Sequence, residues 1–292
     1  MRSRFVAAEK DTPVRSFQVP GRSPVYATEA MAATSHPLAT EAAIGAMRAG
    51  GSAADAIVAA AEVLMIAEPH MTGIGGDCFA IISTPDGQLH GLNASGRSAA
   101  VATFDRLSAD GVTAIDEDSI HAVTVPGSVA GWQALIDRFG KLGMDRALQP
   151  AIALAKAGCP VAPRVQHDWA DAVARISSDE GMRKHYLPGG RAPSVGDRHA
   201  LPALAATLER LAKHGAKEGF YRGPVAADIA KTVKAHGGYL TEADLDACEA
   251  TWVAPITSTY RDVEIAEIPP NGQGLTALIM LNILDALGPM PT

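Results

Sequence analysis

The first clear pattern of apolar and small residues predicts two consecutive helices. One runs from Pro37 to Ala49 and stops at Gly50–Gly51, because proline suits an opening turn and glycine suits the position after the last turn. The second follows Ser52, which can cap it, and Asp55 lies in its first turn, near the positive end of the helix dipole. Apolar residues occupy nearly every face of this second helix up to Glu68–Pro69. We therefore expect it to be buried.

A hairpin is predicted directly after these helices. Residues 78–84 and 88–93 are strand-like and are joined by Pro85–Asp86–Gly87, which is a strong turn signal. The preceding segment, Gly73 to Asp77, is rich in glycine, and we expect its glycines to adopt positive φ or to permit close packing. Asp77 is expected to stabilise this turn. The chain thus passes from two helices into a sheet.

The rest of the chain is mostly helical by its spacing, with strands near the end. Helices are expected over 125–140, 149–158, 164–176 and 202–215, within 219–240, and from a capping pattern at Thr241 to Asp244. Residues 251–268 alternate as strands do. A glycine-rich turn then leads into a last helix, around Leu275 to Leu287, that is apolar nearly all round. Because such a helix needs neighbours on all sides, we expect later sequence or another chain to complete the core.

Composition and charge exclude several classes of protein. The chain has 292 residues, 47% of them hydrophobic, and a formal net charge of −7 without any run of Lys or Arg. This balance argues against disorder and against a nucleic-acid partner. The amino terminus lacks the apolar stretch of a secretory signal, so a cytoplasmic location is expected. The stretch Leu275 to Leu287 is too short to span a bilayer and is interrupted by Asn282 and Asp285, so no membrane contact is expected.

Most motifs that carry chemistry are absent. The three cysteines, Cys78, Cys159 and Cys248, are widely spaced among apolar or small residues, so reduced and mostly buried thiols are expected instead of a disulfide framework or a metal site. The glycine-rich turn follows a helix and opens a strand, the reverse of a dinucleotide loop. Ser128 lies outside any GxSxG elbow and is interpreted as a helix start after a strand. His36 precedes a helix and is interpreted as a capping or surface group.

Arg97 is the candidate binding residue. It follows a predicted strand and lies among small residues in the segment GLNASGRSAA, which leaves room for its guanidinium to bind a carboxylate through two hydrogen bonds. The alternative, on this residue alone, is an ordinary exposed surface arginine.

Several blocks of the sequence, in order, resemble the γ-glutamyltranspeptidase family. The segment SHPLATEAAIGAMRAGGSAADAIVAAAEVLMIAEPHMTGIGGDCFAI is similar to the family's first block. VPGSVAGW, LQPAIALAKAGCPV, GFYRGPVAADIA, GGYLTEADL and IPPNGQGLTALIMLNIL resemble later ones. The resemblance extends from about Val25 to the end, so residues 1–24 are interpreted as an N-terminal extension and 25–292 as the larger-subunit part of a domain.

The resemblance implies an α+β fold, the four-layer αββα sandwich of N-terminal nucleophile hydrolases, incomplete in this chain. It further implies a precursor that cuts itself into two subunits, with a catalytic Thr at the new amino terminus of the smaller one. No catalytic residue is therefore expected in this chain. The implied partners are the smaller subunit or C-terminal segment that bears this Thr and a small amide substrate with a carboxylate. No metal or organic cofactor is implied, and Arg97 matches the arginine that holds the substrate carboxylate.

Three departures from the family pattern leave the substrate open. Asp77–Cys78 stand where many members have glycines, NASGR replaces the commoner sequence before the arginine, and PPNGQG replaces PPSSGG. These variants resemble the cytoplasmic, oxamate amidohydrolase-like branch more than the secreted glutathione-processing enzymes. The expected function is thus a γ-glutamyltransferase or hydrolase, with an oxamate or other carboxylate-amide amidohydrolase as the alternative. A third possibility, of another class, is a non-catalytic binding or assembly protein on the same scaffold.

Overall fold

A computed structural model describes residues 24–288, which fall into two units. Residues 24–31 belong to the first unit and contain no helix or strand, whereas the second unit begins at Ala32 and holds every described element. The expected extension, residues 1–24, lies almost entirely outside the described residues, and its boundary stays a prediction.

The two predicted N-terminal helices are confirmed as α1 (Pro37–Arg48) and α2 (Ala53–Ala67), which pack side by side. His36 caps α1, since its Nδ1 accepts a hydrogen bond from the backbone N–H of Leu38 at 3.2 Å. The capping interpretation of His36 is therefore confirmed, whereas a surface position is wrong because the residue is only 7% exposed. Burial lowers the pKa of this imidazole, although Glu68 acts in the opposite direction.

The predicted cap of α2 also connects this helix to a distant loop. Ser52 and Asp55 form a reciprocal capping box. The fully buried Asp55 carboxylate also accepts hydrogen bonds from the backbone N–H groups of Lys141 and Leu142, at 2.8 and 3.1 Å. Burial by itself would raise the pKa of Asp55, but the hydrogen bonds to its charged form lower it overall.

Glu62, in the middle of α2, is an exception to the pairing of buried polar groups. Its side chain is fully buried, and neither carboxyl oxygen has a hydrogen-bond partner among the described residues. Burial raises the pKa of this carboxyl well above its ordinary value. Since an unpaired buried charge is far more costly than an unpaired neutral acid, this environment favours the protonated form of Glu62.

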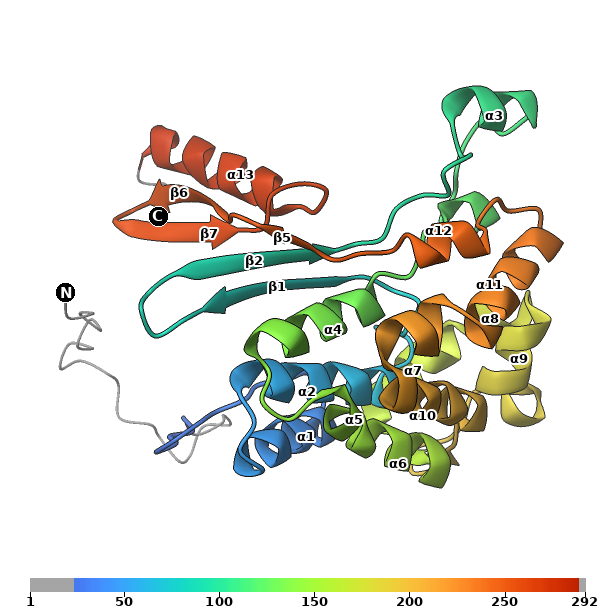
Figure 1. The fold of residues 1–292 in the computed structure, drawn as a ribbon, viewed down its shortest axis with the longest axis horizontal. Coiled ribbons are helices and arrows are strands. Elements are labelled where there is room, and N and C mark those ends of the chain that lie inside the picture. The colour runs from blue at the N-terminus through green and yellow to red at the C-terminus, as the bar shows by residue number, and fades with distance from the viewer. Residues whose placement is uncertain (1–23, 289–292) are drawn as a thin grey trace. The chain divides into compact units, whose positions relative to one another are not determined.

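The predicted hairpin is confirmed and forms most of a three-stranded antiparallel sheet. Strands β1 (Cys78–Ser83) and β2 (Leu89–Ala94) pair from Cys78↔Ala94 to Ser83↔Leu89, and β5 (Thr251–Val253) joins the other edge of β2. Helix α4 (Ser128–Phe139) packs against both β1 and β2 and separates them from α2 (Figure 1).

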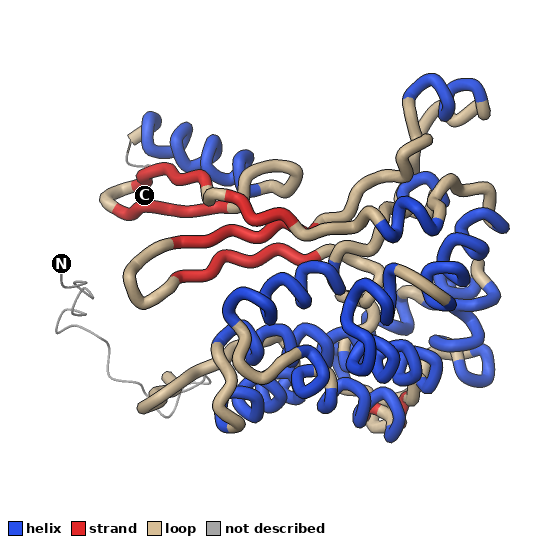
Figure 2. The backbone as a smooth tube through the Cα atoms, viewed as in Figure 1, coloured by secondary structure: helices blue, strands red, loops and turns tan. Residues whose placement is uncertain are grey.

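The C-terminal part forms a second hairpin covered by a helix. Strands β6 (Ile256–Tyr260) and β7 (Val263–Glu267) pair with each other, and α13 (Gly274–Leu287) packs against them. Figure 2 shows these strands and the helix on the side of the sheet away from α4. The strands predicted over 251–268 are thus confirmed.

Apolar surface is exposed on both of these parts. In α13 only Leu278 is buried, while Met280, Ile283 and Leu287 are 57%, 55% and 68% exposed. On β1, the Cys78 side chain faces Gly131 of α4. Because successive side chains of a strand point to opposite faces of the sheet, the exposed Phe79 and Ile81 lie on the face away from α4. Clusters of exposed apolar side chains are typical of interaction surfaces.

The remaining elements are mainly helical, and of these α5 (Met144–Ala147) and α6 (Gln149–Ala157) pack against α2. The predicted helix over 164–176 is interrupted at Ala172 and becomes two helices, whereas the other predicted helices are confirmed. Short elements without an apolar stripe, such as α3 (Phe104–Ala109) and α9 (Glu180–Tyr186), are absent from the prediction. The helices are α3 (Phe104–Ala109), α5 (Met144–Ala147), α6 (Gln149–Ala157), α7 (Pro163–Asp171), α8 (Val173–Ser177), α9 (Glu180–Tyr186), α10 (Pro202–Ala216), α11 (Pro224–Ala235) and α12 (Glu242–Asp246). Smaller elements are the 3-10 turns Ile120–Ala122 and Pro188–Gly190, the π-turn Lys217–Tyr221, and the paired strands β3 (Cys159–Pro160) and β4 (Arg198–His199).

The buried Glu62 predicts an unusual dependence of stability on pH. A carboxyl whose pKa is higher in the folded than in the unfolded protein destabilises the fold as pH rises above its ordinary value of 4.5, by up to about 1.4 kcal/mol per pH unit. Glu62→Gln removes this ionisation. We therefore expect the free energy of unfolding of the variant, relative to wild type, to increase between pH 5 and pH 8. Urea unfolding of the complete protein measures it, with the exposed Glu41→Gln as the control, and a pH-independent difference would contradict the assignment.

Candidate functional site

The segment at the end of β2 crosses the segment that leads into α4, and the two backbones lie in close contact. Gly96 has a φ of +77°, and a Cβ atom there would lie 1.7 Å from the carbonyl oxygen of Val125. A Cβ at Gly127 would lie 2.0 Å from the carbonyl oxygen of Ala94. The backbone N–H of Val125 donates to the carbonyl of Arg97 at 2.9 Å. Only glycine at both positions permits this crossing.

Arg97 emerges from this crossing into a cavity of about 700 Å³. Its side chain is exposed, and within residues 24–288 no carboxylate lies in salt-bridge distance of its guanidinium. The cavity is also lined by Ser95, Ser98, Asp244 and Glu249. A guanidinium without an ion-pair partner in a polar hollow is suited to binding an anionic ligand.

Two side-chain bridges hold the loop that carries Arg97. Before it, the Asn93 side chain donates from Nδ2 to Oδ1 of Asn271 at 3.0 Å and accepts at its own Oδ1 from the backbone N–H of Ser95, also at 3.0 Å. After it, the Asp244 carboxylate accepts from the backbone N–H of Ala100 at 2.8 Å while capping α12. Burial opposes ionisation of Asp244, but the hydrogen bonds that it accepts lower its pKa overall.

Sequence reasoning missed Asn93, Asn271 and the second role of Asp244. The pattern at Thr241 to Asp244 predicted the cap, which the structure confirms, but no local signal links residue 244 to residue 100. Asn93 and Asn271 lie in two of the segments that depart from the commoner family sequences. That departure was the only signal in the sequence that could have identified them.

The glycine-rich turn before β1 is hydrogen-bonded to the start of α4. The carbonyl oxygen of Gly76 accepts hydrogen bonds from the backbone N–H groups of Gly127 and Ser128, at 2.9 and 3.0 Å, at the start of α4. The tight turn is confirmed. Of the two reasons expected for its glycines, positive φ is wrong for Gly73, Gly75 and Gly76, and close packing is found only at Gly76, where a Cβ would lie 3.3 Å from the Gly73 carbonyl oxygen. The crowding that does demand glycine lies at Gly96 and Gly127 instead.

Ser128 is confirmed as the first residue of a helix. Its hydroxyl donates to the carbonyl oxygen of Ile74 at 2.8 Å, and its side chain is buried. The segment before it, residues 123–127, is not a strand, because within the described part of the chain it makes only isolated backbone–backbone hydrogen bonds to distant segments, from Val125 to Arg97 and from Gly127 to Gly76. Ser128 therefore holds the turn against the helix.

The three cysteines are free thiols, as expected. Cys159 is buried, whereas Cys78 and Cys248 are only partly buried. Burial, assisted by the neighbouring Asp77 carboxylate, raises the pKa of Cys78 to about 11. A thiol with such a pKa is not a nucleophile at neutral pH.

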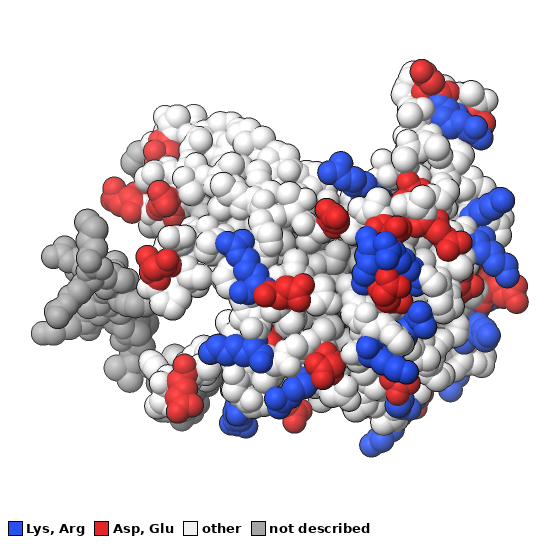
Figure 3. Space-filling model, in the orientation of Figure 1, with Lys and Arg blue, Asp and Glu red and all other residues white. Residues whose placement is uncertain are grey.

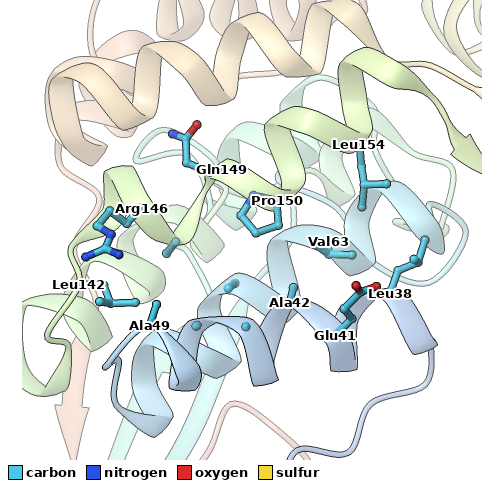
Figure 4. Close-up of a pocket in the computed structure, with 14 residues that line it drawn as sticks. Leu38, Glu41, Ala42, Ala49, Val63, Leu142, Arg146, Gln149, Pro150 and Leu154 are labelled. Atoms are coloured by element: carbon cyan, nitrogen blue, oxygen red, sulfur yellow. The ribbon is translucent and has the colours of Figure 1, made fainter.

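A second hollow lies away from the crossing. This groove, about 620 Å³, lies between α1 and the α5–α6 segment, with Ala59 and Val63 of α2 among its lining residues (Figure 4). Most of its lining is apolar, and its charged groups, Glu41 and Arg146, are exposed side chains. It lacks the convergent polar groups of the Arg97 cavity.

Charge and metal-ligand patterns add no further site. On the face shown in Figure 3, acidic and basic side chains intermingle over the helical part, without a basic stripe. Among residues 24–288, no group of three His, Cys, Asp or Glu side chains is placed to hold a metal ion. Within the same residues no helix is both long enough and apolar enough to cross a bilayer.

Comparison with known proteins identifies what this chain is similar to. Residues 39–291 match the family described as Gamma-glutamyltranspeptidase. The chain is 36% identical over 266 residues to the oxamate amidohydrolase proenzyme of Klebsiella pneumoniae, which covers 89% of this chain and 50% of that protein. It is 34% identical over 263 residues to the glutathione hydrolase-like YwrD proenzyme of Bacillus subtilis, with 89% and 50% covered. The chain thus spans about half the length of these curated relatives.

Solved structures agree with these matches. The cephalosporin acylase of Bacillus halodurans is 40% identical with a TM-score of 0.86, covering 94% of this chain and 52% of that one. The γ-glutamyltranspeptidase of Helicobacter pylori is 31% identical with a TM-score of 0.85, covering 92% of this chain and 80% of that one. The mixed helix-and-sheet fold expected from the sequence is therefore confirmed.

The crossing predicts a sharp difference between two glycines. Gly96→Ala should destabilise the complete protein by about 3 kcal/mol, because the new methyl group meets the Val125 carbonyl and the backbone φ is unfavourable for alanine. Gly75→Ala is the matched control, since no atom lies within 4 Å of a Cβ there and its φ is not positive. Thermal unfolding measures both variants. Equal stability of the two would show that the crossing is not rigid.

Proposed function

Because the chain belongs to the γ-glutamyltranspeptidase family, we propose that it is the larger-subunit part of a self-processing amidohydrolase or acyltransferase. The nucleophile is the amino-terminal Thr of the smaller subunit, outside this chain. Its hydroxyl oxygen attacks the substrate's amide carbon, and its own α-amino group accepts the proton and passes it to the departing amine. Water or a second amine then releases the acyl group, which gives hydrolysis or transfer. The cycle uses no metal or organic cofactor.

Arg97 binds the carboxylate of the amide substrate in this proposal. The observation that carries the assignment is the exposed guanidinium, which has no ion-pair partner within residues 24–288 and is held over a polar cavity by the glycine crossing. A carboxylate can take two of the parallel N–H donors of a guanidinium. Such a pair fixes the orientation of the substrate relative to the scissile amide.

The smaller subunit completes the fold in this proposal. The exposed apolar side chains of α13 and of the sheet face that bears Phe79 and Ile81 support a partner that covers them. The added segment would complete the four-layer αββα sandwich and make the mature protein a heterodimer of two chains from one precursor. We also propose a cytoplasmic location for it.

Two substrate classes fit a carboxylate site of this kind. A γ-glutamyl amide carries its carboxylate several bonds from the scissile carbonyl, whereas oxamate carries it on the adjacent carbon. The 36% identity to an oxamate amidohydrolase proenzyme supports oxamate-like amides as the alternative to γ-glutamyl amides. Parallel assays with γ-glutamyl anilide and oxamate separate the two.

Substitution of Arg97 tests the proposal. Arg97→Ala should raise the free energy of the transition state by about 2–5 kcal/mol, the cost of removing one partner of a charge pair. Arg97→Lys should restore only part, since a point charge does not reproduce the planar fork. The measurement is kcat/KM in the complete protein, with a gel that scores self-cleavage. A loss below about twofold, or a failure of self-cleavage, would contradict the assignment.

The chain by itself should have no amidase activity and should be poorly soluble. It lacks the proposed nucleophile and exposes an apolar helix. The test is expression of residues 1–292 alone beside the complete precursor, with assays of both substrates and mass and N-terminal sequencing of every polypeptide obtained. Turnover by the isolated chain would overturn the proposal, as would a precursor that yields no chain beginning with Thr. The latter result would favour a binding or assembly protein.

A further inference from the structure

The hydrogen bond between Asn93 and Asn271 is a connection that the proposed function does not use. It joins residues 178 positions apart at a distance of 3.0 Å, and both side chains line the cavity of Arg97. Asn93 is the penultimate residue of β2, and Asn271 lies in the turn between β7 and α13. The bond therefore joins the strand that leads to Arg97 to the turn before the last helix.

Asn93 transmits this connection to the Arg97 loop through its own second hydrogen bond. Its Oδ1 accepts from the backbone N–H of Ser95 at 3.0 Å, which fixes the first turn of the loop. The amide of Asn93 uses its donor and its acceptor at once, so its orientation is set by both partners. Without the Asn271 side chain, Nδ2 of Asn93 loses the partner that fixes the orientation of the amide. The backbone N–H of Ser95 then loses an acceptor held in one position.

The other supports of the loop do not replace this one. The Val125 N–H holds the carbonyl of Arg97, and Asp244 holds the N–H of Ala100, both at or after Arg97. The Asn93–Asn271 bond is the side-chain restraint on the side before Arg97. Asn271 is exposed and has no other hydrogen bond among the described contacts, so removing its side chain does not open the core.

The two asparagines also lie in the two segments, NASGR and PPNGQG, where this sequence departs from the commoner family pattern. Far apart in the chain, these departures meet in space through one hydrogen bond. We propose that the Asn93–Asn271 pair positions the Arg97 loop and thereby sets the preference of the enzyme for amides that carry a carboxylate. This proposal rests on the proposed role of Arg97.

The test compares two substrates that differ only in the carboxylate, γ-glutamyl anilide and 4-aminobutyryl anilide, in the complete protein. Asn271→Ala should lower kcat/KM for the glutamyl compound by about 5- to 20-fold, the effect of losing one or two hydrogen bonds of ordinary strength, and for the other compound by less than about twofold. Asn282→Ala is the matched control. It removes another side-chain hydrogen bond of an asparagine, to Ser258, but in α13 and away from the cavity, and should leave the ratio of the two rates unchanged.

A double-variant cycle with Arg97→Ala identifies the route of the effect. If Asn271 acts through Arg97, Asn271→Ala should change the glutamyl rate by less than about twofold once Arg97 is alanine. A further loss in that background would mean that Asn271 contacts the substrate itself, and an equal loss for both substrates would mean a merely structural role. Either result overturns the proposal.

The same variants distinguish a failure of the Arg97 role from a failure of the positioning role of the asparagine pair. If Arg97→Ala leaves the glutamyl preference intact, the proposed role of Arg97 fails, and the positioning role fails with it. If Arg97→Ala abolishes the preference while Asn271→Ala leaves it unchanged, the role of Arg97 stands and only the positioning role of the asparagine pair is wrong.

Discussion

The close crossing of two backbone segments determines where the candidate site lies. At Gly96 and Gly127 the end of β2 and the approach to α4 come so near that a single methyl group on either would collide with a carbonyl oxygen. The crossing is fixed by the bond from Val125 to Arg97, and α4 is held in turn by the Gly76 carbonyl and by Ser128. Through these contacts the packing of α4 on the sheet decides where the Arg97 backbone lies. The flexible Arg97 side chain is therefore attached to a backbone whose position is fixed.

Apolar residues are buried in one part of the molecule and exposed in another. Helix α2 is buried over most of its length, and even its Glu62 side chain is buried, without a hydrogen-bond partner among residues 24–288. Helix α13 has a similarly apolar sequence, yet only Leu278 is buried. The same sequence pattern thus has two outcomes because burial depends on which neighbours are present. This contrast supports a partner that covers α13 and the open sheet face.

The sequence predicted the elements whose signals are local. The caps at His36, Ser52 and Thr241 and the turn at Pro85–Asp86–Gly87 each depend on residues a few positions apart, and all are confirmed. The local sequence left open whether Arg97 binds a ligand or is an ordinary surface arginine, and the family resemblance favoured binding. The absence of an ion-pair partner among the described residues is a three-dimensional property that no local pattern shows. The bridges from Asn271 and Asp244 span more than a hundred residues, so local sequence patterns could not predict them. The glycines at 73–76 misled for the opposite reason, since their abundance suggested positive φ where none occurs.

The most direct test of the account is a crystal structure of the complete protein with a carboxylate-bearing amide analogue that is not cleaved. The account predicts the carboxylate within hydrogen-bond distance of both terminal nitrogens of Arg97, the scissile carbonyl facing an amino-terminal Thr of the second chain, and that chain covering α13. An analogue bound elsewhere, for instance in the groove between α1 and α6, with Arg97 facing open solvent, would contradict it.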